Sequence, residues 1–229
     1  MKTIGILGGM SAASTQIYYR ELCRLTRENL GGLHSPELLI RSVDFDEIEK
    51  LQASAEWDRA AKILKEKAVA LERGGADLLI MATNTMHKVA DELRGALSIP
   101  FIHIADATAA AILEAGFQKP GLMATAFTME QAFYIERLAA RGLSPAIPGV
   151  DDRAETHRII YDELCRDIVR DDSRLTFELI AQRLIDQGCD CLILGCTEVG
   201  MLLNQDNVGV EVFDTTLIHC KAALEAALQ

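Results

Sequence analysis

The chain contains one segment twice, and this repeat limits the folds that it can adopt more than any other feature. Residues 75–85 read GADLLIMATNT and align without a gap with residues 188–198, which read GCDCLILGCTE. A periodic apolar stretch precedes each copy, and shorter matches accompany them in the same order, such as Asp106-Ala-Thr108 with Asp214-Thr-Thr216. A chain that repeats itself in this way predicts two similar halves built from the same supersecondary units.

Short β-rich runs alternate with longer stretches of helical periodicity along the whole chain. Helices are expected at 57–74, 105–115 and 129–141, and strands at 3–7, 37–43, 77–83, 101–105, 121–125, 191–196 and 210–214. This alternation predicts an α/β fold with mostly parallel sheets flanked by helices. We expect one half to comprise 1–100 with 209–229, and the other 101–208.

The composition and charge of the chain restrict the kinds of partner that it is expected to bind. The 229 residues carry a formal net charge of −11, whereas a nucleic-acid partner would require a basic stripe. No apolar run reaches the ~18 residues of a membrane span, and the N-terminus has no secretory signal pattern. The six cysteines form no CxxC pair and are expected to be reduced thiols. A cytoplasmic protein that binds a small molecule, without nucleic acid or membrane, is therefore expected.

Thr83 and Cys196 occupy equivalent positions of the repeat, directly after an apolar strand. Ligands of open α/β sheets bind outside the carboxyl ends of the strands, so the two residues are expected to confront each other across a ligand. A thiol at the start of a helix has its thiolate form favoured, which would make Cys196 a base near neutral pH. The alternative for Cys196 is a small buried hydrophobic residue, which is how Cys189 and Cys191 are interpreted.

Other polar and glycine-rich segments follow the strands. Asn84 and Thr85 suit either helix capping or a grip on a substrate carboxylate through free N–H groups. Gly8-Gly9-Met10 lets the backbone approach a ligand closely, but it is not a dinucleotide-binding fingerprint. His87 is expected at the surface or behind the site, and none of the histidines has a spacing that predicts a metal site.

Three motifs, GGMS at 8–11, NTMH at 84–87 and GCTE at 195–198, resemble the aspartate/glutamate racemase family. Four further segments resemble a broad enterobacterial-type subgroup of it most closely, namely 33–35, 42–45, 83–88 and 103–106. The resemblance covers essentially the whole chain. It implies two pseudo-symmetric α/β domains with the active site in the interdomain cleft, often in a homodimer, and an isomerase that uses neither pyridoxal phosphate nor a metal. The substrate contacts that it implies, together with those read from the motifs, are Met10, Gln52 in the loop after the second strand, Asn84, Thr85, Thr125, Thr128 and Thr197.

In that family two cysteines flank the substrate Cα, and one removes the proton while the other returns one to the opposite face. Cys196 matches the C-terminal cysteine, whereas Thr83 stands where the other would be. Family members also often carry a basic residue that holds the distal carboxylate of the substrate, and the position of that residue falls near Cys165. A hydroxyl is a far weaker acid than a thiol, so Thr83 is a poor candidate for proton abstraction.

The resemblance therefore predicts a racemase of aspartate or glutamate that is biased toward the L-enantiomer, with Cys196 as base and Thr83 as a weak or water-assisted acid. Relatives that decarboxylate disubstituted malonates use only the C-terminal thiol, and maleate isomerases and hydantoin racemases are related as well. A protein that binds dicarboxylates without catalysis is a further alternative, because one of the two acid/base groups is lost.

Overall fold

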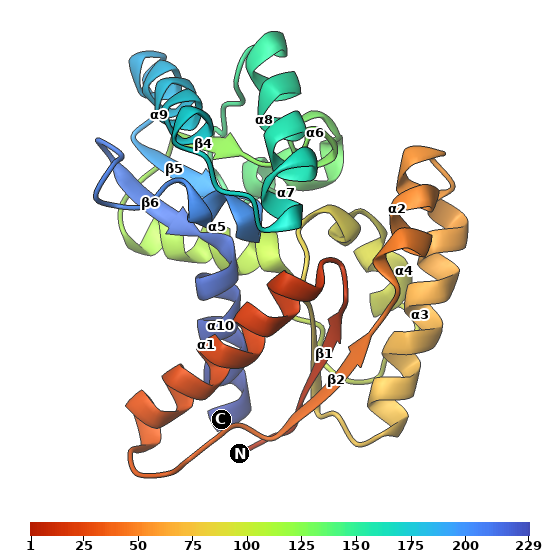
Figure 1. The fold of residues 1–229 in the computed structure, drawn as a ribbon. Coiled ribbons are helices and arrows are strands. Elements are labelled where there is room, and N and C mark those ends of the chain that lie inside the picture. Colours follow the sequence, from red (N-terminus) through yellow and green to blue (C-terminus); the bar gives the residue numbers. More distant parts are fainter. The chain divides into compact units, whose positions relative to one another are not determined.

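The computed structural model describes residues 1–229 and divides into two compact units (Figure 1). Unit 1 comprises Met1–Ile104 and His219–Gln229, and unit 2 comprises Ala105–Ile218. The boundaries expected from the sequence, at 100 and 208, lie in connecting segments. In the structure the two units divide at the first turn of helix α5 (Ile104–Glu114) and inside helix α10 (Thr215–Leu228).

Unit 1 is built on a three-stranded parallel sheet in the order β2-β1-β3. Ile4 of β1 pairs with Leu38 of β2 and with Leu78 of β3. The elements of this unit, besides the end of α10, are β1 (Ile4–Gly8), α1 (Ala12–Leu30), β2 (Leu38–Ser42), α2 (Phe45–Ala53), α3 (Trp57–Arg73), β3 (Leu78–Met81), η1 (Thr85–Val89) and α4 (Ala90–Arg94).

Alternate side chains of the unit 1 strands enter two different cores. Leu79 and Met81 of β3 pack with α2, α3 and η1, whereas Leu78 and Ile80 pack with α1 and α10. Successive residues of a strand point to opposite faces, so a sheet with helices on both sides buries every position of a central strand. All five residues of β1, the central strand, are accordingly buried, and so are all four of β3, whose outer side makes a bridge from Leu79 to Phe101.

Unit 2 contains a second three-stranded parallel sheet, in the order β4-β5-β6. Its core is formed by β5 with α8, η2, α9 and η3. The elements are α5, β4 (Pro120–Met123), α6 (Ala126–Glu130), α7 (Ala132–Ala140), α8 (Val150–Asp162), η2 (Leu164–Arg166), α9 (Asp171–Asp186), β5 (Cys191–Leu194), η3 (Thr197–Met201), β6 (Glu211–Asp214) and the start of α10.

One expected strand, 101–105, is absent from the sheet of unit 1. Phe101 makes only an isolated parallel bridge to Leu79, and α5 begins at Ile104. Ala146 makes a comparable isolated bridge to Gly121 of β4 in unit 2. With these bridges included, both sheets have the same order, β2-β1-β3-Phe101 in unit 1 and Ala146-β4-β5-β6 in unit 2. The two halves expected from the sequence repeat therefore share one topology, and the predicted strand at 101–105 is wrong because its pairing is reduced to one residue.

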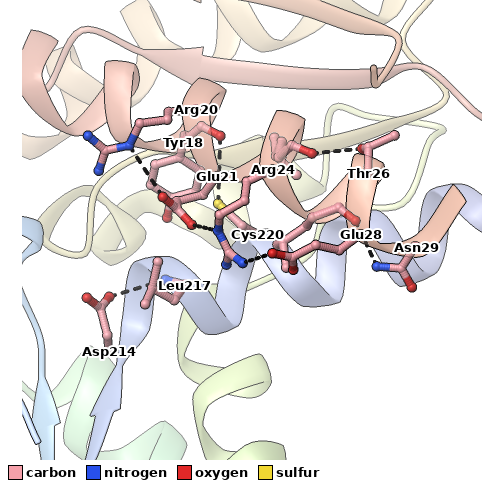
Figure 2. A network of polar contacts seen from close by, with 12 residues as sticks. Tyr18, Arg20, Glu21, Arg24, Thr26, Glu28, Asn29, Asp214, Leu217 and Cys220 are labelled. Carbon is pink, nitrogen blue, oxygen red and sulfur yellow. Dashed lines mark hydrogen bonds and ion pairs between the residues drawn. The ribbon is translucent and has the colours of Figure 1, made fainter. Parts of the chain in front are cut away.

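Local contacts explain where the first helix begins and ends. The Ser11 hydroxyl accepts a hydrogen bond from the Ser14 amide at 3.2 Å, which caps the N-terminus of α1, and Gly31 ends the helix with a φ of 76°. Along α1, Arg24 forms ion pairs with Glu21 and Glu28 at 2.7 and 2.6 Å (Figure 2).

None of the helices in the structure combines the length and apolar character needed to cross a membrane.

His219 joins α10 to α1 inside unit 1. Its Nε2 lies 2.8 Å from the Ile102 carbonyl, which can only accept, so Nε2 carries the proton and Nδ1 accepts from the Tyr18 hydroxyl at 2.8 Å. The side chain has no exposed surface. Burial lowers the pKa of His219 from 6.5 to about 4, because the charged imidazolium would lose its hydration.

We expect the free energy of unfolding to fall as the pH drops from about 6.5 to about 4, because the unfolded state takes up a proton there that the folded state does not. A shift of this size corresponds to about 3 kcal/mol for this one side chain. Urea unfolding of the wild type and of His219→Gln at several pH values measures it. An identical pH dependence in both proteins would contradict the assignment.

His87 joins the end of β3 to the start of α5. Its Nδ1 donates to the Thr83 carbonyl at 2.7 Å, and its Nε2 accepts from the Ile104 amide at 3.3 Å. The imidazole is only 3% exposed. His87 is therefore not a surface residue but a buried link behind Thr83, the second of the two positions expected from the sequence.

Replacing His87 by Ala leaves a buried carbonyl and a buried amide without this partner, which costs about 1–3 kcal/mol. We expect thermal and urea unfolding of His87→Ala to show a loss of that size. His34→Ala provides the matched control, because His34 is exposed in the loop after α1 and should change stability by less than about 0.5 kcal/mol. Equal stability of the two variants would refute the structural role of His87.

Candidate active site

In unit 1 the predicted site residues lie at the carboxyl edge of the sheet. The strands are parallel, so the segments after β1 and β3 emerge at the same edge. After β1, Gly9 has a φ of 91°, its amide donates to the Thr15 hydroxyl at 2.8 Å, and a Cβ at this position would collide with the backbone of Val43. Only glycine fits this turn, which places Met10, 4% exposed, next to the edge.

Gln52 differs from its expected position. It lies in α2 and not in a loop, because Asp44 accepts a hydrogen bond from the Asp46 amide and starts the helix directly after β2. The side chain is 3% exposed, and its Nε2 lies 2.9 Å from the Sδ of Met86 in η1. Gln52 therefore connects α2 to the segment that follows β3.

Thr83, Asn84 and Thr85 follow β3 in direct succession. Asn84 and Thr85 are 5% and 6% exposed, and Thr83 is partly buried. The His87 imidazole holds the Thr83 carbonyl, which fixes the backbone from which the hydroxyl projects. The structure thus brings three consecutive polar side chains to the carboxyl edge of this sheet, and the sequence repeat predicted their position.

In unit 2 the corresponding segment follows β5 and carries Cys196. A Cβ on Gly195 would lie 2.7 Å from Leu122 and 2.8 Å from Ala124, so glycine is needed for close packing of β5 against β4. Cys196 precedes η3, and its Sγ donates a hydrogen bond to Oε2 of Glu198 at 2.9 Å. Glu198 is 5% exposed and Cys196 is partly buried, so the carboxylate of this pair is shielded from water more completely than the thiol.

The electrostatic surroundings of Cys196 are opposite to those expected from the sequence. The pKa of its thiol is raised well above the ordinary value, first by burial and then by the negative charge of Glu198, with a further contribution from Cys165. The five-residue 3₁₀ helix that follows does not outweigh these effects. Burial and the carboxylate of Glu198 thus favour the thiol form of Cys196, whereas its position before a helix was expected to favour the thiolate.

Paired threonine hydroxyls surround the same edge of unit 2. Thr197 Oγ1 lies 3.0 Å from Thr216 Oγ1, and Thr125 Oγ1 lies 3.2 Å from Thr128 Oγ1. All four side chains are at most 9% exposed. Three of them, Thr125, Thr128 and Thr197, were predicted as substrate contacts, and their segments follow β4 and β5 at one edge of the sheet.

Sequence reasoning assigned no role to Glu198, Thr216 or Cys165. Glu198 stands within the GCTE motif, and its spacing of two residues from Cys196 was the available signal. Thr216 follows β6, the last strand of the unit 2 sheet. Its match to Thr108 in the sequence repeat was the available signal. Cys165 lies in η2, where burial above all raises its pKa to about 12, and nothing in the sequence connects η2 with Cys196.

Comparison with known proteins identifies the family of the chain. The Asp/Glu/Hydantoin racemase family model matches residues 7–223. A broad specificity amino-acid racemase, RacX, from Bacillus subtilis (strain 168) is 23% identical over 98% of both chains. The crystal structure of a candidate Asp/Glu racemase from Yersinia pestis is 46% identical with a TM-score of 0.94, and that of an aspartate racemase homologue from Pyrococcus horikoshii OT3 is 37% identical with a TM-score of 0.88, each with 100% of both chains covered. The chain belongs to the Asp/Glu/hydantoin racemase family.

Proposed function

We propose that the protein is a cofactor-independent amino-acid racemase that acts on aspartate or glutamate. Cys196 is the base that removes the Cα proton from the L-enantiomer, and Thr83 supplies or relays a proton at the other face of the substrate Cα. The observation that carries this proposal is the equivalence of two strand ends. Thr83 follows β3, Cys196 follows β5, and both strands occupy the third position of sheets with one topology.

The two side chains are chemically unequal, and this inequality sets the expected direction of catalysis. A thiol titrates near ~8.5, whereas an aliphatic hydroxyl is much less acidic, so Thr83 cannot rest as an alkoxide at neutral pH. A hydroxyl can still donate a hydrogen bond or pass a proton from water to a strongly basic carbanion. Removal of the Cα proton should therefore be efficient only from the face of the substrate that is directed to Cys196.

Polar groups at the two edges suit the charged ends of a dicarboxylic amino acid. Asn84, Thr85, Thr125, Thr128 and Thr197 supply amide and hydroxyl groups, and Met10 and Gln52 are proposed as further contacts. None of these seven side chains carries a positive charge. The carboxylates would be held by neutral donors, which stabilise an anion through several simultaneous hydrogen bonds. The relatives that bear the names of amino-acid, aspartate and Asp/Glu racemases support a substrate of this class.

Loss of the Cα hydrogen in D₂O tests the proposal. We expect exchange from L-aspartate or L-glutamate to exceed exchange from the D-enantiomer, and Cys196→Ala to reduce it by about 10²–10⁴-fold, the usual contribution of a general base. Proton NMR of the four amino acids measures both effects. Cys23→Ala is the matched control, because Cys23 lies in α1 and has no proposed role. Equal exchange from both enantiomers, or exchange that survives Cys196→Ala, would sink the proposal.

A second candidate is supported by the presence of only one thiol at the two strand ends. A decarboxylase of disubstituted malonates needs one group that protonates an enediolate from one face, and Cys196 is such a group. Release of CO₂ from an aryl malonate, without Cα exchange from any of the four amino acids, would favour this activity. Ligand-induced thermal stabilisation with neither reaction would favour a dicarboxylate-binding protein.

A further inference from the structure

We propose that His157 is a positioning residue, which holds the first turn of α6 and thereby the proposed substrate contacts Thr125 and Thr128 in place. This inference rests on the racemase function proposed above and adds to it a residue outside the substrate contacts. The geometry that carries it is the hydrogen bond that the Ala126 amide donates to Nδ1 of His157, 3.2 Å long. Figure 1 shows α8, which carries His157, beside α6 in unit 2.

Helix α6 is too short to fix its own position. It has five residues, Ala126–Glu130, whereas an isolated helix needs about 12 or more to be even marginally stable in water. Thr125 occupies the N-cap position, but its side chain does not cap the helix, and its Oγ1 lies 3.2 Å from Oγ1 of Thr128 instead. The first amide of α6 is therefore held from outside, by His157 of another helix.

Helix α8 contacts both ends of α6. His157 accepts a hydrogen bond from the amide of Ala126, where α6 starts. Arg153, four residues earlier and therefore on the same face of α8, donates from Nε to Oε1 of Glu130 at 2.8 Å, where α6 ends. The segment that carries Thr128 is thus held at its two ends by one neighbouring helix.

The hydrogen bond from Ala126 defines the protonation state of His157. A backbone amide can only donate, so Nδ1 is without a proton and the neutral ring carries its proton on Nε2. Burial lowers the pKa of His157 below 6.5, although the carboxylates of Glu130 and Asp162 act in the opposite direction. The imidazole is therefore neutral at pH 7, and a second proton, which would bind at Nδ1, breaks the bond to Ala126.

Aromatic rings and carboxylates surround the imidazole. The rings of Phe127, in α6, and Tyr161, in α8, have centroids 5.8 and 4.6 Å from that of His157. Glu130 is paired with Arg153, which offsets the charge of this carboxylate. The other ion pairs of α8 join Arg158 to Glu155 and Glu163, and Arg183 of α9 to Asp152. The two aromatic contacts keep the imidazole in one orientation and favour its neutral form.

Two substitutions separate the acceptor from the ring. His157→Phe keeps a ring and removes the acceptor, whereas His157→Asn keeps an oxygen near the position of Nδ1 and takes up no proton. We expect His157→Phe to raise KM for Cα exchange of L-glutamate or L-aspartate by about 2- to 10-fold, the effect of one hydrogen bond. The change in kcat should be smaller, because Thr125 and Thr128 bind substrate and move no proton. His157→Asn should keep KM within about 2-fold of the wild type.

The pH dependence of KM distinguishes positioning from a general structural role. In the wild type, KM should rise as the pH falls below the pKa of His157, because the protonated ring no longer accepts from Ala126. KM should be high in His157→Phe and low in His157→Asn, and in neither should it change over this interval. His34→Phe is the matched control, because His34 is exposed and lies in unit 1, so its profile should match the wild type. A KM that rises equally in the wild type and in His157→Asn would overturn the proposal.

Amide exchange separates this inference from the proposed function. If the wild type exchanges the Cα hydrogen of none of the four amino acids, the racemase proposal fails, but the amides of α6 still report whether His157 holds this segment. Hydrogen–deuterium exchange of Ala126–Glu130 should be about 2- to 10-fold faster in His157→Phe than in the wild type or His157→Asn, with exchange of β5 unchanged. Unchanged exchange of α6 in His157→Phe, or equal acceleration in α6 and β5, would overturn the positioning role.

Discussion

Parallel strand pairing is the constraint on which the candidate site depends. In each unit the strands run in one direction, so the segments that leave β1 and β3, or β4 and β5, emerge at one edge of a sheet. Glycines let these segments stay close to the sheet, Gly9 by its positive φ and Gly195 by its contact with β4. The polar residues that follow the strands are therefore gathered by backbone geometry, and His87 adds a buried link that fixes the end of β3.

The chemistry then depends on the side chains that come after each strand. The segment after β5 supplies a thiol that donates a hydrogen bond to a buried carboxylate, and the segment after β3 supplies a hydroxyl. A pair of thiols would serve both faces of a Cα atom equally, whereas a thiol–carboxylate pair and a hydroxyl cannot. The proposed bias toward L-substrates is thus a consequence of one side chain, Thr83.

Much of the fold was predictable because apolar periodicity and the internal repeat report the same elements. The helix expected at 57–74 is α3, and six of the seven expected strands form. The strand expected at 101–105 does not form, because only Phe101 pairs with the sheet, through a single bridge to Leu79. The positions of Thr83 and Cys196 after strands were likewise predictable. The raised pKa of Cys196 was not, because it arises above all from burial in the folded chain, with further contributions from Glu198 and from Cys165, a residue of η2 that is distant in sequence.

The most direct test of the asymmetric site is the position of deuterium when L-glutamate or L-aspartate is incubated with the enzyme in D₂O. With one efficient base, the Cα atom should exchange and return to the same enantiomer, so we expect deuterium in recovered L-substrate before an equal amount of D-product forms. Thr83→Cys, which supplies a second thiol, should shift the outcome toward D-product. Deuterium confined to the D-product of the wild-type enzyme would contradict the unequal roles of Cys196 and Thr83.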